Sequence, residues 1–162
     1  PTTKVAYPRS IVAYDEAGNE VFRSIALWVL MDLGSRSMVL PGKSGLEVDG
    51  ISLGDELAAP ASLVPAAGEN RQLRQVRFTD LDVNGHMNNT QYLNWVEDLL
   101  PGSHHKDHPV KAFTVCYLNE AREGQDLVLD WDFLEENMLF MDAHRDTGEK
   151  TDRVFAAKIL YN

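Results

Sequence analysis

One amphipathic helix pattern, set among strand patterns, constrains the fold of this chain more than any other feature. Between residues 88 and 100, apolar side chains recur at offsets of three and four, which is typical of a helix with a broad apolar face. Either Asn88 or Asn89 suits the N-cap, because a short amide side chain can accept a hydrogen bond from free backbone N–H groups. Pro101 and Gly102 are expected to end the helix, and SHHKDHP (103–109) to form a loop. The apolar positions are Tyr92, Leu93, Trp95, Val96, Leu99 and Leu100.

Strand patterns lie on both sides of this helix. Before it, RQLRQVRFTD predicts a strand across 73–78. After it, KAFTVCYLNEA (111–121) and DLVLDWDFLEE (126–136) alternate polar and apolar residues, and NMLFMDAHRD (137–146) and RVFAAKILYN (153–162) complete a series of four strands. The order of strand, helix and four strands predicts an α+β unit in which one antiparallel sheet wraps one helix.

The first forty residues predict a β-hairpin. A strand at 11–14 leads into the turn-rich DEAGNE (15–20), and residues 21–31 form a long apolar stretch that we expect to be buried for most of its length. GSRS (34–37) predicts a second turn and MVLP (38–41) a short strand. Residues 46–70 are rich in Gly, Pro, Ala and Ser, which indicates a linker with room for a short helical turn and not a second core.

Composition limits the classes of function. At 162 residues the chain has room for one ordinary domain, or one domain plus a fragment, and a hydrophobic fraction of 44% is enough for a packed core. The net charge of −10 argues against nucleic-acid binding, which needs a basic surface. The sequence has no apolar run of the roughly 18 residues that would suggest a membrane span. The single cysteine, Cys116, excludes an internal disulfide and is expected to be a small core side chain.

A cluster of polar residues precedes the helix in TDLDVNGHMNN (79–89). Asp82, Asn84 and His86 are spaced by two, and in an extended segment this spacing puts the three side chains on one face. The free N–H groups at the start of the predicted helix lie just beyond and favour negative charge. Taken alone, the cluster could also be a turn and a helix cap, since Asp, Asn and Gly are common turn formers.

Two segments of the sequence, FTDLDVNGHMNNTQYLNWVEDLLP (78–101) and VCYLNEAREGQDL (115–127), resemble the acyl-acyl carrier protein thioesterases of bacteria and plant plastids. The resemblance implies a hotdog fold, in which an antiparallel sheet curls around a central helix. Residues 13–41 also look like the last strands of that family's first hotdog domain. Because the family carries two such domains in tandem, we expect an incomplete first domain at 1–45, a linker at 46–70 and the second hotdog domain at 71–162. A homo-oligomer or a further N-terminal segment is expected to complete the first domain.

The positions that match the family's motif are Asp82, Asn84, His86 and Glu120, and the resemblance implies that they are catalytic. Thioester hydrolysis needs an activated water, a polarised carbonyl and a protonated leaving thiol. The hypothesis is that Glu120 and His86 bind and deprotonate the water. Asn84 would hold the water or the thioester, and Asp82 would orient these groups through hydrogen bonds. Some plant members place a cysteine directly after the acidic residue, and Ala121 stands there in this chain.

Further residues are candidates for substrate binding. Asn88 and Asn89 lie close enough to the motif to touch the substrate, and Trp95 could line the acyl tunnel. Acyl carrier protein is acidic, as this chain is, so docking needs a local basic patch. Arg71 and Arg74 just before the motif could form that patch, although alternate positions on a predicted strand could equally be a solvated face.

The resemblance thus implies hydrolysis of fatty acyl-acyl carrier protein to a free fatty acid, in the cytoplasm or, in a plant, the plastid stroma. No metal or cofactor is expected, because His104, His105 and His108 lie in a predicted loop without helical spacing. Two alternatives stay open. An acyl-CoA thioesterase of the same fold would hydrolyse CoA esters with comparable efficiency, and a non-catalytic acyl-binding or assembly fragment would bind ligand without turnover.

Overall fold

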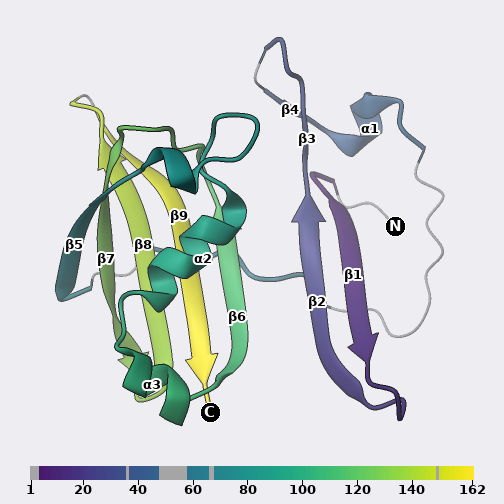
Figure 1. The fold of residues 1–162 in the computed structure, drawn as a ribbon. Coiled ribbons are helices and arrows are strands. Elements are labelled where there is room, and N and C mark those ends of the chain that lie inside the picture. Colours follow the sequence, from purple (N-terminus) through teal and green to yellow (C-terminus); the bar gives the residue numbers. More distant parts are fainter. Residues whose placement is uncertain (1–3, 36, 48–57, 66–67, 149) are drawn as a thin grey trace. The chain divides into compact units, whose positions relative to one another are not determined.

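The computed structural model describes residues 4–35, 37–47, 58–65, 68–148 and 150–162. The chain forms two compact units, Pro1–Ala61 and Ser62–Asn162 (Figure 1). Much of the predicted linker at 46–70 and one residue of the predicted turn at 34–37 lie outside the described residues. Within the described ranges, each helix is too short or too polar to span a membrane.

The second unit is built on one sheet of five strands in the order β5-β7-β8-β9-β6, and all neighbours pair antiparallel. The four strands predicted after the helix are confirmed. Because β6 pairs with β9, the first strand after the helix lies beside the last strand of the chain (Figure 1). The strands are β5 (Asn70–Gln75), β6 (Val110–Tyr117), β7 (Asp126–Glu135), β8 (Met138–Asp146) and β9 (Thr151–Tyr161).

Helix α2 (Asn89–Glu97) lies across this sheet (Figure 1). Its apolar face carries Tyr92, Trp95 and Val96, which are at most 3% exposed and join the core with sheet residues such as Leu129 and Phe155. Burying an apolar side chain of this size stabilises the fold by roughly 1.5–3 kcal/mol. Packing of this face therefore holds a helix that is too short to be stable alone. The arrangement is the expected α+β hotdog fold.

The helix begins where the sequence predicts and ends earlier. Asn88 is the N-cap, and its side-chain oxygen accepts a hydrogen bond from the Thr90 N–H at 3.0 Å, which confirms an asparagine cap. The backbone N–H groups of Leu99 and Leu100 bond to carbonyls three residues back. This tighter pattern ends the α-helix before Pro101 is reached.

The structure corrects the predictions for residues 103–109 and 73–78. The predicted loop at 103–109 contains a helix, α3 (Gly102–Asp107), and the ring nitrogens of His105 contact the carbonyl and carboxylate of Glu97 at 2.9 and 3.1 Å. This contact fastens α3 to the end of α2 and is not visible in local composition. The strand predicted across 73–78 ends at Gln75. A 3₁₀ turn, η1 (Phe78–Asp80), follows because the Asp80 carboxylate accepts a hydrogen bond from the Arg77 N–H at 2.8 Å.

Residues 68 and 69, at the end of the predicted linker, pack on β7 within the second unit. A Cβ atom added to Gly68 would lie 2.5 Å from the carbonyl oxygen of Trp131, so the backbone at 68 rests directly on β7. The Glu69 N–H donates to the Asp132 carboxylate at 3.1 Å. These contacts place the start of β5 along β7.

The first unit is a β-hairpin, as predicted. β1 (Tyr7–Tyr14) pairs with β2 (Glu20–Trp28), and the Asp15 carboxylate accepts the N–H groups of Ala17 and Asn19 in the turn. The predicted burial of residues 21–31 is wrong, because Val21, Phe22 and Trp28 are each more than half exposed. A two-stranded ribbon has no second layer of its own to cover an apolar face. The unit also contains β3 (Leu30–Met31), β4 (Met38–Val39) and α1 (Pro41–Ser44).

Candidate active site

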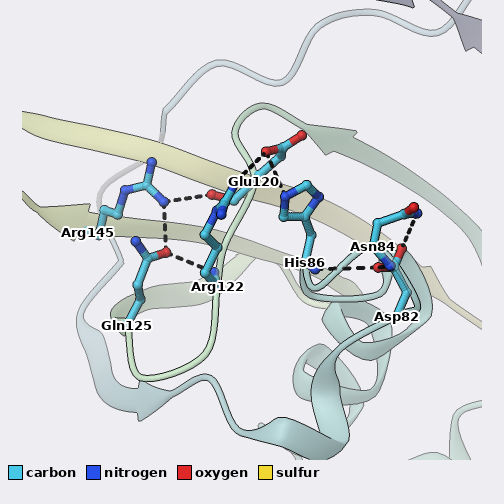
Figure 2. A network of polar contacts seen from close by, with 7 residues as sticks. All are labelled: Asp82, Asn84, His86, Glu120, Arg122, Gln125 and Arg145. Atoms are coloured by element: carbon cyan, nitrogen blue, oxygen red, sulfur yellow. Dashed lines mark hydrogen bonds and ion pairs between the residues drawn. The ribbon is translucent and has the colours of Figure 1, made fainter. Parts of the chain in front are cut away.

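A histidine and a glutamate from distant parts of the sequence meet in the second unit. Nε2 of His86 lies 3.2 Å from Oε2 of Glu120. Figure 2 shows the two side chains pointing toward each other. The His86 side chain is 20% exposed and that of Glu120 is 47% exposed. The pair is therefore anchored in the protein on the histidine side and open to solvent on the carboxylate side, so a water molecule can reach the carboxylate.

His86 stands in a tight turn and not in the extended segment that the spacing of two suggests. The Asp82 N–H donates to the His86 carbonyl at 2.8 Å, and the Gly85 N–H donates to the Asp82 carbonyl at 3.1 Å. Gly85 has φ of +74°, which suits glycine. The prediction that Asp82, Asn84 and His86 lie on one face of an extended chain is therefore wrong, because the Asn84-Gly85 pair forms a turn.

The carboxylate of Asp82 holds this turn together. Its Oδ1 accepts the N–H of Asn84 at 2.8 Å and that of His86 at 3.4 Å, and its Oδ2 accepts the Asn84 side-chain amide at 3.3 Å (Figure 2). The hydrogen bond from the Asn84 N–H is the main cause that lowers the pKa of Asp82, and partial desolvation opposes it. Asp82 therefore stays ionised and fixes the backbone that carries His86.

Backbone hydrogen bonds bring Glu120 to this turn. The Met87 N–H donates to the Ala121 carbonyl at 2.8 Å, and both residues are at most 4% exposed. β6 ends at Tyr117, so Glu120 lies in the connection to β7 and not on the strand as predicted. The connection leaves the sheet and crosses to the motif turn, and this places the carboxylate next to the imidazole.

An arginine also lies beside Glu120. Nη2 of Arg122 is 3.8 Å from Oε2 of Glu120, the same oxygen that faces His86, and the Arg122 side chain is 61% exposed. The carboxylate thus has nitrogen donors on two sides and solvent on another. Such a carboxylate is held in a defined position and can accept a proton from a bound water.

The other candidate residues have separate contacts. Asn88 uses its side-chain oxygen to cap α2, and the carbonyl of Asn89 accepts the Tyr117 hydroxyl at 3.2 Å. Trp95 is 2% exposed in the core, and the guanidinium of Arg74 lies 4.6 Å above its ring.

Both arginines proposed for docking are in ion pairs. Arg74 contacts Asp98 of the α2 C-cap at 2.7 Å. Arg71 contacts Asp130 of β7 at 2.6 Å. Each arginine side chain is at least 29% exposed and can still be approached from solvent.

Among the residues that the structure describes, no group of three His, Cys, Asp or Glu side chains gathers in a way that could hold a metal ion. His104, His105 and His108 have their rings close together: His104 lies 4.7 Å from His108 and 5.8 Å from His105. Burial is the largest cause that lowers the pKa of His104, and the neighbouring histidines add to it. The His104 imidazole is therefore favoured in its neutral form.

Comparison with known proteins agrees with the geometry. The family model described as the acyl-ACP thioesterase C-terminal domain matches residues 65–162, more than half of the chain. The chain belongs to the acyl-ACP thioesterase family. Among curated members of the family, it is 28% identical over 127 residues to the chloroplastic palmitoyl-acyl carrier protein thioesterase of Gossypium hirsutum, covering 74% of this chain and 30% of that protein.

Solved structures of acyl-ACP thioesterases share the fold. One is the acyl-ACP thioesterase from Bacteroides thetaiotaomicron, with a TM-score of 0.85 and 20% identity, covering all of this chain and 65% of that chain. Another is the 12:0-ACP thioesterase from Umbellularia californica, with a TM-score of 0.76 and 22% identity, covering all of this chain and 64% of that one. The chain thus spans less than two thirds of the length of the relatives that it matches.

Proposed function

We propose that this chain hydrolyses the thioester of fatty acyl-acyl carrier protein, giving a free fatty acid and the carrier's thiol, as a step of fatty acid biosynthesis. The contact of 3.2 Å between His86 and Glu120 carries the proposal, since it places a carboxylate that can act as a base next to an imidazole. Membership of the acyl-ACP thioesterase family points to the same reaction.

In the proposed mechanism, Glu120 and His86 bind one water molecule between the carboxylate and the thioester carbonyl. The carboxylate takes a proton from the water as the water oxygen attacks the carbonyl carbon. The tetrahedral intermediate then collapses, the carbon–sulfur bond breaks, and the proton passes to the leaving sulfur. Asn84 orients the water or the thioester oxygen, and Asp82 holds the turn that carries Asn84 and His86. In this reaction the thioester and one water molecule give the carboxylic acid and the free thiol.

The carrier protein is the proposed partner, with Arg71 and Arg74 as its docking residues. Because each guanidinium is paired with an aspartate of this chain, docking would exchange Asp130 and Asp98 for acidic groups of the carrier. Reversing the charge at both arginines should raise KM for the carrier-bound substrate and leave kcat unchanged. Lys150→Glu, a reversal at an exposed site elsewhere on the unit, is the matched control. An unchanged KM in the double arginine variant would remove these residues from the docking surface.

The division of the chain is part of the proposal. We interpret residues 1–45 as the closing strands of a first hotdog domain, 46–70 as a linker and 71–162 as the second domain. The exposed apolar side chains of the β1–β2 hairpin favour completion by another segment or another copy of the chain. Light scattering separates the two, because a second copy doubles the mass in solution. The site of action follows the carrier: the cytoplasm of a bacterium or the stroma of a plastid.

The test of the reaction is hydrolysis measured with acyl-carrier protein and acyl-CoA of several chain lengths, with the Glu120→Ala variant as the blank. The proposal expects turnover of carrier-bound substrates above that of CoA esters. Equal efficiency on CoA esters would replace it by the acyl-CoA thioesterase alternative. Ligand binding without turnover in the folded chain would favour the non-catalytic alternative.

A further inference from the structure

Glu120 lies in the connection between β6 and β7, and an arginine of strand β8 contacts this connection from the side of the sheet. Nη1 of Arg145 donates to the Glu120 carbonyl at 2.7 Å and to Oε1 of Gln125 at 3.1 Å. The same Gln125 oxygen accepts the backbone N–H of Arg122 at 2.9 Å. Figure 2 shows these three bonds on the side of the connection opposite the motif turn.

The two ends of the connection are tied to the sheet by other bonds. At its start, the N–H groups of Leu118 and Asn119 donate to the Val154 carbonyl at 2.9 and 3.1 Å. At its end, Val76 exchanges backbone hydrogen bonds with Gly124 and Gln125, each 2.9 Å long. These bonds fix where the connection begins and ends. They leave the peptide of Glu120 itself to be placed by contacts in the middle.

Two of the contacts that act there lie on opposite sides of the connection. The Met87 N–H holds the Ala121 carbonyl from the motif turn, and the Arg145 guanidinium holds the Glu120 carbonyl from the sheet. Arg145 is itself well fixed, since its side chain is 19% exposed and lies 3.7 Å from the Asp152 carboxylate. A planar guanidinium that is already oriented loses little freedom when it donates two bonds.

We propose that Arg145 and Gln125 form a positioning pair for Glu120. This inference rests on the proposed function. The pair acts through the backbone: it fixes the distance between the Glu120 carboxylate and His86 and does not touch the substrate. A displacement of about 1 Å at a reacting group can cost about 100-fold in rate. The pair therefore contributes to kcat while leaving substrate binding alone.

The first test is Arg145→Met in the full chain, assayed with acyl-carrier protein. The inference expects kcat to fall about 10- to 100-fold with KM changed by less than about twofold. Gln125→Met should give a smaller loss in the same direction, and Arg145→Lys, which keeps one donor, should recover part of the rate. Lys150→Met is the matched control, because Lys150 shares the Asp152 partner at 2.9 Å and is 71% exposed. That control should keep the normal kcat.

The decisive readout is the same substitution in a Glu120→Ala background. If Arg145 acts through Glu120, Arg145→Met lowers the residual rate of that background no further. An equal loss in both backgrounds would mean a general structural role and would overturn the inference, as would normal kcat in a folded Arg145→Met variant. Should Glu120→Ala alone keep full activity, the catalytic assignment fails first, and the positioning role fails with it. If Arg145→Met does not fold, the same comparison is made with Gln125→Met.

Discussion

Arg153 of β9 neutralises a carboxylate that the sheet buries, so its removal should have a large and pH-dependent cost. Asp142 of β8 is 5% exposed, and both of its oxygens accept Nε of Arg153, at 2.8 and 3.1 Å. The guanidinium also donates to the Leu63 carbonyl at 3.2 Å. Arg153→Met keeps most of the apolar stem of the side chain and deletes all three bonds.

Removing one partner of a buried ion pair leaves an uncompensated charge and costs about 3–5 kcal/mol. In a unit of about 100 residues, each kcal/mol lowers Tm by about 4–8 °C, so the variant should melt at least about 12 °C below the parent at pH 7. Replacing both partners with apolar residues, Asp142→Leu with Arg153→Met, should recover most of this loss, because no buried charge remains.

The sign of the pH dependence follows from Asp142. Burial raises the pKa of this carboxyl, and Arg153 opposes that shift, as does the nearby His144, while Asp130 adds to it. An acid with a raised pKa in the folded state favours folding when it is protonated, and it costs stability as pH rises through that pKa. Without Arg153 the pKa rises further. The deficit of the variant relative to the parent should therefore be small below about pH 4 and reach its full size at neutral pH.

Urea unfolding of both proteins at several pH values, followed by circular dichroism, measures this difference. A deficit under about 1 kcal/mol at pH 7, or one that does not change between pH 4 and 7, would refute the reasoning. The first result would show that the sheet lets water reach Asp142, and the second that the lost packing and not the charge carries the cost.

Three further predictions follow from local geometry. Gly68→Ala should destabilise the second unit by about 1–3 kcal/mol in urea unfolding, because the added Cβ meets the backbone of β7, whereas Gly42→Ala, which meets open space, should be neutral. Asn88→Ala removes the N-cap of α2 and should lower the free energy of unfolding by about 1 kcal/mol, also measured by urea unfolding. An unchanged free energy of unfolding would show that the cap does not contribute to stability. Because the pKa of Asp82 is lowered, its hydrogen bonds stabilise the turn fully above the usual carboxyl pKa and are lost as pH falls through the lowered pKa. The NMR chemical shift of the Asn84 backbone amide should therefore change in the pH range of that lowered pKa. In Asp82→Ala the same shift should stay constant over this range.

The sequence predicts the helix and sheet of the second unit well because their signals are periodic. The apolar residues of α2 repeat at helical offsets and all pack inward, and the alternation predicted along β7 matches the burial of Leu127 and Leu129. In β8 and β9 consecutive residues are buried, which alternation alone does not predict.

Local turn chemistry and long-range contacts explain what the sequence does not predict. The pair Asn84-Gly85 is typical of a turn, but the spacing of Asp82, Asn84 and His86 also fits a strand. The hydrogen bonds that the Asp82 carboxylate accepts stabilise the turn over the strand. The exposure of Phe22 depends on what lies over a ribbon, which residue type alone does not determine. The sequence does not indicate a role for Arg145, because a single arginine in a strand is usually a solvated residue. Its hydrogen bond to the Glu120 carbonyl forms only in the folded sheet.

The measurement that tests the central claim most directly is a double-mutant comparison of kcat for His86→Ala, Glu120→Ala and the double variant, with acyl-carrier protein as substrate and the fold of each variant checked by thermal unfolding. If the two residues act on one water as a unit, each single substitution lowers kcat by about 10²–10⁴-fold and the double variant is no slower than the worse single one. Near-normal kcat in either folded single variant, or losses that multiply in the double variant, would contradict the account.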